Sequence, residues 1–304
     1  MNCTTALELN WTGRPRSIAA ALLRTGSTNA IVDPGPGSTL STLREQLGLH
    51  GLAVSDLHAI FLTHIHLDHA GATGSLVQEN PNLRVFVHSR GVRHMTAPSA
   101  LLQSAGRLYG EKMDALFGEF LPVPESNLQM LHGGETVTLG DTALRALYTP
   151  GHASHHMTYF EESGGIAFVG DTAGICVEGH PLVLPATPPP DIDLELWSAS
   201  LDAIEQLKSQ RLFLTHFGFS NDPSRHLASY RNRLHLWASI AAKILSAGLG
   251  DTEALQEFTR QVSAEAEGLL TPAEIQHYRY NGQLPLSWLG LSRYHRKRAG
   301  VSTP

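Results

Sequence analysis

The sequence contains few cysteines, no excess of basic residues and no long apolar run. Cys3 and Cys176 are the only cysteines in 304 residues, too few for a disulfide framework, so we predict a protein of the reducing cytoplasm. Lys and Arg number 22 against 28 Asp and Glu, and the net charge is −6. This balance disfavours nucleic acid and anionic membranes as partners.

Signals for export and membrane insertion are also missing. Met1–Asn10 has neither the basic start nor the apolar core of a signal peptide, and no apolar run approaches the roughly 20 residues of a membrane span. Hydrophobic residues make up 42% of the chain and charged residues 16%. The chain can therefore bury a large core, in one large domain or two small ones.

Histidine, in contrast, is abundant, and its densest cluster lies in Ile60–Gly71. Histidine and carboxylate side chains are the ligands of zinc and similar divalent ions. His64 and His66 point the same way from an extended loop and can close on one ion, whereas Asp68 and His69 come where the chain turns into a helix and point elsewhere. Two directions suit two neighbouring metal positions. The alternative is a surface cluster of solvated histidines.

Three later strands are expected to end in further ligands. His152 follows Tyr-Thr-Pro-Gly, Asp171 follows Phe-Val-Gly, and His216 follows Leu-Phe-Leu-Thr. Each residue alone is typical of a turn or a cap. Together with the cluster they form a series of ligands at strand ends, which is how α/β scaffolds build sites.

Expected strands fall into two groups, roughly 1–90 and 129–170, and each group is followed by helix. This order predicts two facing sheets with helices outside. A helix is expected over 68–78, directly after the cluster, and a mostly helical insert over 98–120. The chain after residue 220 is expected to be mostly helical, with a frayed tail over 293–304.

The motifs T-H-I-H-L-D-H-A-G, T-P-G-H, G-D-T and L-T-H-F-G resemble those of the metallo-β-lactamase-fold hydrolase superfamily, which includes glyoxalase II and acyl homoserine lactone lactonases. The resemblance covers about residues 15–220. It implies an α/β fold, the four-layer αββα sandwich, with extra C-terminal helices. We accordingly predict a catalytic domain over 1–220 and a helical extension packed on it over 221–304.

The resemblance also implies two divalent metal ions per chain, which we expect to be Zn²⁺, while Mn²⁺ and iron stay open because His and Asp accept all three. His64, His66 and His152 would hold one ion, and Asp171 would bridge. The second ion would be held by Asp68, His69 and His216. Flavodiiron relatives have glutamate where this chain has His66, which disfavours a redox role.

Two dications lower the pKa of a shared water enough to supply a metal-bound hydroxide, and one polarises the oxygen of the scissile group. Asp68 would orient the nucleophile or pass a proton to the leaving group. We therefore expect hydrolysis of a small ester-like substrate: a lactone, a thioester or a related acyl compound. Phosphodiester or phosphotriester hydrolysis and a non-catalytic metal-binding role are the alternatives, and a homodimer through the insert or tail is an open expectation. A β-lactamase role is disfavoured by the missing signal peptide.

Residues near these motifs have less defined roles. Asp33 either accepts a hydrogen bond from a ligand histidine or is a turn residue. His155 and His156 are expected to pack at the pocket edge or in the core.

Outside the ligand motifs, Cys176 is expected to be a small core residue, with an approach to the site as the alternative. Arg107, Tyr109 and Lys112 in the insert form either part of a lid or, as we favour, a solvated helix face. We expect specificity to come from the segments 98–124 and 173–190 and from the helical tail.

Overall fold

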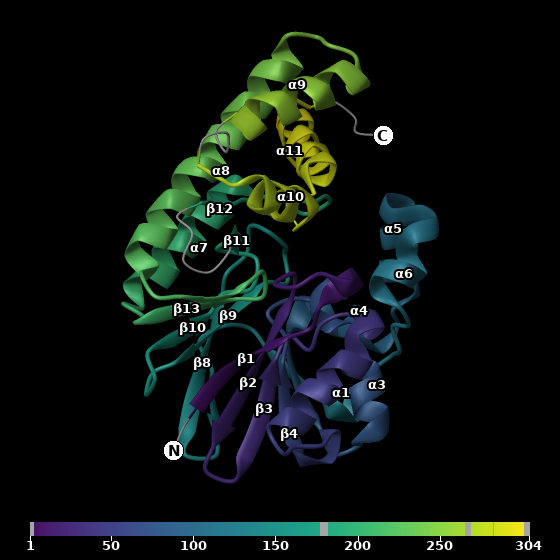
Figure 1. Cartoon of the computed structure of the whole chain (residues 1–304), viewed down its shortest axis with the longest axis vertical. Coiled ribbons are helices and arrows are strands. Elements are labelled where there is room, and N and C mark those ends of the chain that lie inside the picture. Colours follow the sequence, from purple (N-terminus) through teal and green to yellow (C-terminus); the bar gives the residue numbers. More distant parts are fainter. Residues whose placement is uncertain (1–2, 177–181, 265–268, 282, 301–304) are drawn as a thin grey trace.

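The structure is a computed structural model that describes residues 3–176, 182–264, 269–281 and 283–300. Two six-stranded sheets face each other, with helices on both outer faces (Figure 1). The first sheet has the order β1-β2-β3-β4-β5-β6. Its strands are β1 Cys3–Glu8, β2 Ala19–Thr25, β3 Thr28–Val32, β4 Leu57–Phe61, β5 Arg84–His88 and β6 Leu128–Leu131.

The second sheet has the order β14-β13-β10-β9-β8-β7. Its strands are β7 Thr136–Leu139, β8 Thr142–Tyr148, β9 Met157–Glu161, β10 Ile166–Phe168, β13 Arg211–Leu214 and β14 Gly218–Ser220. A short separate pair is formed by β11 Ile175–Cys176 and β12 Val183–Leu184. Strands β2 and β3, β7 and β8, and β9 and β10 form antiparallel hairpins.

Helices separate into two groups by position along the chain. The first group lies in the first half: α1 Leu40–Leu49, α2 Leu67–Ala70, α3 Thr73–Glu79, α4 Ser89–Thr96, α5 Ser99–Tyr109 and α6 Met113–Phe117. The second group is α7 Leu194–Gln206, α8 Pro223–Ser246, α9 Asp251–Ala264, α10 Pro272–Asn281 and α11 Leu284–Arg298. None of the helices in the described ranges is both long and apolar enough to cross a membrane.

Three clusters of buried residues correspond to the three interfaces of a four-layer sandwich. Between the sheets lie residues such as Phe61, Tyr159 and Phe213. The opposite face of each strand supplies the outer clusters, as Ile60 and Leu62 do toward the first helices and Leu212 toward α7 and α8. Because both faces of these strands are buried, their sequences read as continuous apolar runs. The predicted αββα sandwich with C-terminal helices is confirmed.

The C-terminal helices share one core with the second sheet and α7. Trp237 of α8, Phe258 of α9 and Trp288 of α11 are buried in contact in the cluster that also holds Trp197. The helices therefore pack on the sandwich through apolar contacts, while the division at residue 220 stays a prediction.

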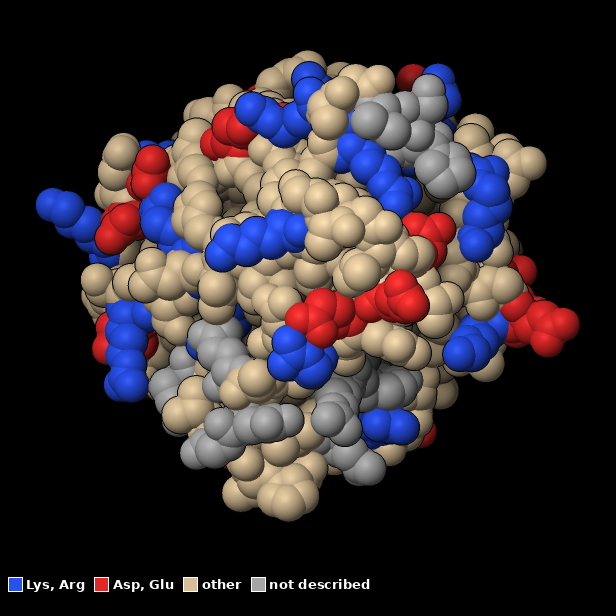
Figure 2. All heavy atoms as spheres, turned by 90° about the horizontal axis from the view of Figure 1, so that it is seen from above, with Lys and Arg blue, Asp and Glu red and all other residues tan. Residues whose placement is uncertain are grey.

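Basic and acidic side chains are interspersed on the face over this end of the molecule (Figure 2).

Two local predictions were wrong. The helix expected over 68–78 is interrupted, because the Ala72 amide donates to the Gly35 carbonyl at 2.8 Å and the Gly35 amide donates to the His69 carbonyl at 3.0 Å. The tail expected to fray from residue 293 instead continues α11 to Arg298, anchored by buried Leu291; residues 301–304 lie outside the described part. Strands β1, β6, β11, β12 and β14 were not foreseen.

Candidate metal centre

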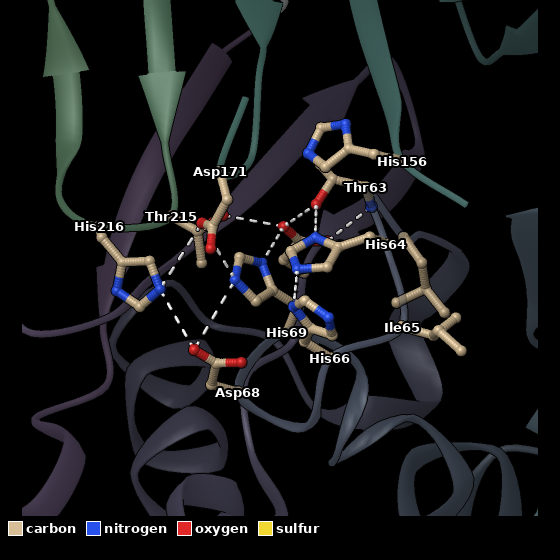
Figure 3. A network of polar contacts seen from close by, with 12 residues as sticks. Thr63, His64, Ile65, His66, Asp68, His69, His156, Asp171, Thr215 and His216 are labelled. Atoms are coloured by element: carbon tan, nitrogen blue, oxygen red, sulfur yellow. Dashed lines mark hydrogen bonds and ion pairs between the residues drawn. The ribbon is translucent and has the colours of Figure 1, made fainter. Parts of the chain in front are cut away.

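The site lies along one edge of the sandwich, where loops from both sheets meet. The cluster loop follows β4 of the first sheet, and His152, Asp171 and His216 follow β8, β10 and β13 of the second. Figure 3 shows the side chains of the cluster loop, Asp171 and His216 converging from separate elements. All the residues expected to be ligands are thus brought together, although 152 positions separate the first, His64, from the last, His216.

Three histidines form the first group able to hold an ion: His64, His66 and His152. His66 Nδ1 lies 2.9 Å from His64 Nε2 and 3.0 Å from His152 Nε2. Burial lowers the pKa of His64 well below its ordinary value and that of His66 to about 4. These rings are therefore neutral at physiological pH, the form in which imidazole binds metal.

Asp68, His69 and His216 form the second group, and His64, His69 and Asp171 form a third that joins the other two. Asp171 Oδ1 lies 3.3 Å from His69 Nε2 and 3.7 Å from His216 Nε2, while Oδ2 lies 3.5 Å from His152 Nε2. One carboxylate therefore faces the histidines of both outer groups.

Buried atoms of the cluster fit a cation. His69 Nε2 and Asp171 Oδ1 are buried and have no hydrogen-bond partner among the described residues, and unpaired buried polar atoms cost about 1–3 kcal/mol each. Burial would lower the pKa of His69, yet Asp171, Asp68 and Asp33 raise it well above its ordinary value. A field that attracts a proton this strongly also attracts a divalent ion, so the cluster can bind metal.

The far side of three ligand rings is held by hydrogen-bonding partners. Asp33 Oδ2 lies 2.8 Å from His69 Nδ1. Of the two alternatives for Asp33, a partner of a ligand histidine and a turn residue, the structure shows the first. His152 Nδ1 faces the Ala186 carbonyl at 2.8 Å, and His216 Nδ1 faces the Ser17 carbonyl at 2.9 Å. Such partners set the tautomer and leave Nε2 directed at the metal position. The two carbonyl partners have no signature in the sequence.

A sequence model described as the metallo-beta-lactamase superfamily matches residues 13–216. The chain belongs to the metallo-β-lactamase superfamily.

Curated relatives of this superfamily match in sequence over part of the chain. A metallo-β-lactamase fold-containing protein of Sulfurisphaera tokodaii is 32% identical over 53% of this chain and 61% of its own length. The thioesterase pkgB of Emericella nidulans is 27% identical over 62% of this chain and 42% of its own. A hydroxyacylglutathione hydrolase of Synechococcus is 28% identical over 62% and 59%. The chain thus spans about half the length of these relatives.

Solved structures of the superfamily match over nearly the whole chain. A metallo-β-lactamase family protein of Thermus thermophilus superposes with a TM-score of 0.70 at 21% identity, covering 98% of this chain and 95% of that one. An archaeal superfamily protein from Sulfolobus tokodaii gives a TM-score of 0.67 at 21% identity, covering 96% and 98%. At this identity the likeness shows the fold, here with the C-terminal helices included.

A cavity of about 300 Å³ opens beside this group of histidine and aspartate side chains. Its floor includes His66, Asp68, Asp171 and His216. The walls come from the segments in which specificity was expected: α5 and Phe117 on one side, residues 186–191 on another, and the start of α11 at residues 283–287. Most of the α5 wall is apolar, with Ala100, Leu101, Ala105 and Leu108.

The structure separates the less defined candidates. His155 lines the cavity, whereas His156 is buried with its Nδ1 3.0 Å from both Thr149 Oγ1 and Thr172 Oγ1. Arg107 and Lys112 are exposed as expected. The favoured assignment of Tyr109 to a solvated face was wrong, because its side chain faces the cavity.

Cys176 is a buried core residue, as expected. Burial raises the pKa of its thiol to about 11 although Tyr278 hydrogen-bonds to it. Since the thiolate is the reactive form, Cys176 stays protonated and inert below that pH. Titration of the native protein with a thiol reagent at pH 8 should modify exposed Cys3 alone, and Cys176 only after denaturation. Rapid modification of both thiols in the folded protein would contradict this.

Gly151, directly before His152, occupies a position only glycine fits. Its φ is +140°, and a Cβ there would lie 2.4 Å from the Cα of Trp197. We expect Gly151→Ala to lower the free energy of unfolding by about 2–4 kcal/mol through backbone strain and overpacking, and to displace His152. Denaturant unfolding measures the first effect and metal affinity the second. Gly134→Ala, also at positive φ but with open space around its Cβ, is the matched control, and equal losses would contradict the packing argument.

Proposed function

We propose that this chain is a dinuclear metal-dependent hydrolase that acts on a small ester-like substrate, namely a thioester, a lactone or a related acyl compound. The observation that carries the proposal is the set of three overlapping ligand groups, which share His64 and His69. A single structural zinc site closes with four ligands around one ion. Here the ligands are divided between two positions, and a cavity opens beside them.

Divalent ions held in such a pair lower the pKa of water and polarise a carbonyl oxygen, and Zn²⁺ is the ion we expect. The chain's own residues position the reaction. Asp68 reaches the cavity with its side chain 20% exposed. Burial opposes its ionisation, but His69 and His216 lower the pKa of Asp68 to about 2. Asp68 is therefore a carboxylate at neutral pH and can accept a hydrogen bond from the nucleophile.

The preference for acyl substrates over phosphoesters is supported by the cavity and by the relatives. Along α5 most of the wall is apolar, which suits an acyl group better than a charged phosphate. Two curated relatives carry names of acyl thioester chemistry, a thioesterase and a hydroxyacylglutathione hydrolase.

A panel of thioesters, lactones, β-lactams and phosphoesters tests the proposal on protein loaded with Zn²⁺ or Mn²⁺. We expect turnover of at least one thioester or lactone, and its loss in His66→Ala. Turnover of phosphoesters alone would contradict the acyl preference. No turnover of any compound, with His66→Ala indistinguishable from the parent, would contradict hydrolysis itself.

A further inference from the structure

Tyr109 is an aromatic residue of the insert that no motif marks. It is the last residue of α5 and lines the cavity together with Asp68, Asp171 and His216. The side chain is half-buried in a wall that is mostly apolar along α5, where Ser104 is the other polar lining residue in the described structure. A phenol at this place adds a polar group to the surface that faces the metal-binding residues.

The ring of Tyr109 is held in place from behind. It packs edge-on against Phe117 with ring centroids 4.8 Å apart. Phe117 is buried and packs in turn on Trp11 at 5.8 Å, and the Trp11 indole donates to the Leu116 carbonyl at 2.5 Å. Such aromatic packing fixes the orientation of a ring with few rotatable bonds, so the hydroxyl has a defined position.

The Tyr109 hydroxyl makes no hydrogen bond with any residue in the described ranges. Three other tyrosines donate to partners inside the chain, Tyr148 to Ser154, Tyr159 to Leu62 and Tyr294 to Glu195. The Tyr230 hydroxyl also lacks a partner among the described residues, but it is buried in the core and does not line the cavity. Burial, together with the carboxylates of Asp68 and Asp171, raises the pKa of Tyr109. The phenol therefore remains protonated at every physiological pH and acts as a donor, never as a base.

We propose that the Tyr109 hydroxyl donates a hydrogen bond to an oxygen of the substrate's acyl group while that group lies at the metal-binding residues. This inference rests on the proposed function and narrows it. The acyl group would lie along α5 with its apolar part against Leu101, Ala105 and Leu108 and its oxygen toward Tyr109. Tyr109 would thus select acyl compounds with an acceptor at that point, because a donor left unpaired in the complex costs affinity.

Tyr109→Phe, which removes only the hydroxyl, tests this in the metal-loaded protein. With the best acyl substrate of the panel we expect kcat/KM to fall about tenfold to a hundredfold, the range of one hydrogen bond to a developing oxyanion. Binding of a short-chain carboxylate, measured by calorimetry, should weaken about tenfold or more. Metal content and melting temperature should not change. Tyr294→Phe, on α11, is the control and should retain both activity and carboxylate binding.

The outcomes separate the two proposals. An active parent whose Tyr109→Phe variant keeps the same kcat/KM and the same carboxylate affinity would overturn the role of Tyr109 and leave the hydrolase intact. A parent inactive on every acyl compound would overturn the proposed function, and this inference with it. Loss of activity in Tyr109→Phe accompanied by loss of metal would assign Tyr109 to holding the fold, and would overturn its role toward substrate.

Discussion

Asp171→Ala is expected to reduce kcat/KM about a thousandfold or more and to lower the metal content of the protein. The reason is that its two oxygens face histidines of both outer ligand groups. Without the carboxylate, one of the negative charges that would offset the repulsion between two neighbouring dications is lost. Steady-state kinetics on the best acyl substrate, with metal analysis of the same samples, measures both effects.

Comparison with His66→Ala sharpens this prediction. His66 belongs only to the group of His64, His66 and His152. Its removal should therefore weaken metal binding at one position and leave binding at the other position unchanged. Asp141→Ala, which removes an exposed carboxylate on the turn before β8, should change neither activity nor metal content. Full metal content in Asp171→Ala would contradict a bridging role for Asp171.

Asp33→Ala is expected to have the second large effect, on both stability and metal affinity. Asp33 is fully buried and accepts from the Thr63 amide at 2.8 Å, the Thr63 hydroxyl at 2.6 Å and the Thr215 hydroxyl at 2.8 Å, besides facing His69. Its loss leaves these donors unpaired. We expect the free energy of unfolding to fall by about 3–5 kcal/mol and metal affinity about 10–100-fold.

Denaturant unfolding and competition with a chelator measure these losses. Asp33→Asn preserves the size of the side chain but not its charge, and should retain more stability than Asp33→Ala while still weakening metal binding. Asp56→Ala serves as the matched control, because Asp56 also accepts a backbone hydrogen bond but is exposed. Metal affinity unchanged in Asp33→Ala would show that the orientation of His69 does not depend on this carboxylate.

The ligand residues were visible in the sequence because their chemistry is local. Histidine and aspartate follow short apolar strands, and the dense run from His64 to His69 marks the site. Asp33 was also within reach, since it ends β3 next to β4, and the structure places it behind His69. Parallel pairing of β3 with β4 brings those two strand ends together.

Other features depend on tertiary contacts that leave no local pattern. The carbonyls of Ser17 and Ala186, which face ligand histidines, are backbone groups that any residue would supply. The break between α2 and α3 comes from hydrogen bonds to the loop around Gly35. Tyr109 lies on an amphipathic helix, and the sequence alone does not show whether the polar side of that helix faces solvent or a cavity. Its role follows from what surrounds it.

The central claim is a centre for two metal ions, and metal analysis of the purified chain tests it most directly. Protein saturated with Zn²⁺ or Mn²⁺ and freed of excess metal by gel filtration should retain two ions per chain. His66→Ala should weaken the binding of one of these ions. Retention of no ion or of a single ion by the unaltered chain would contradict the dinuclear account.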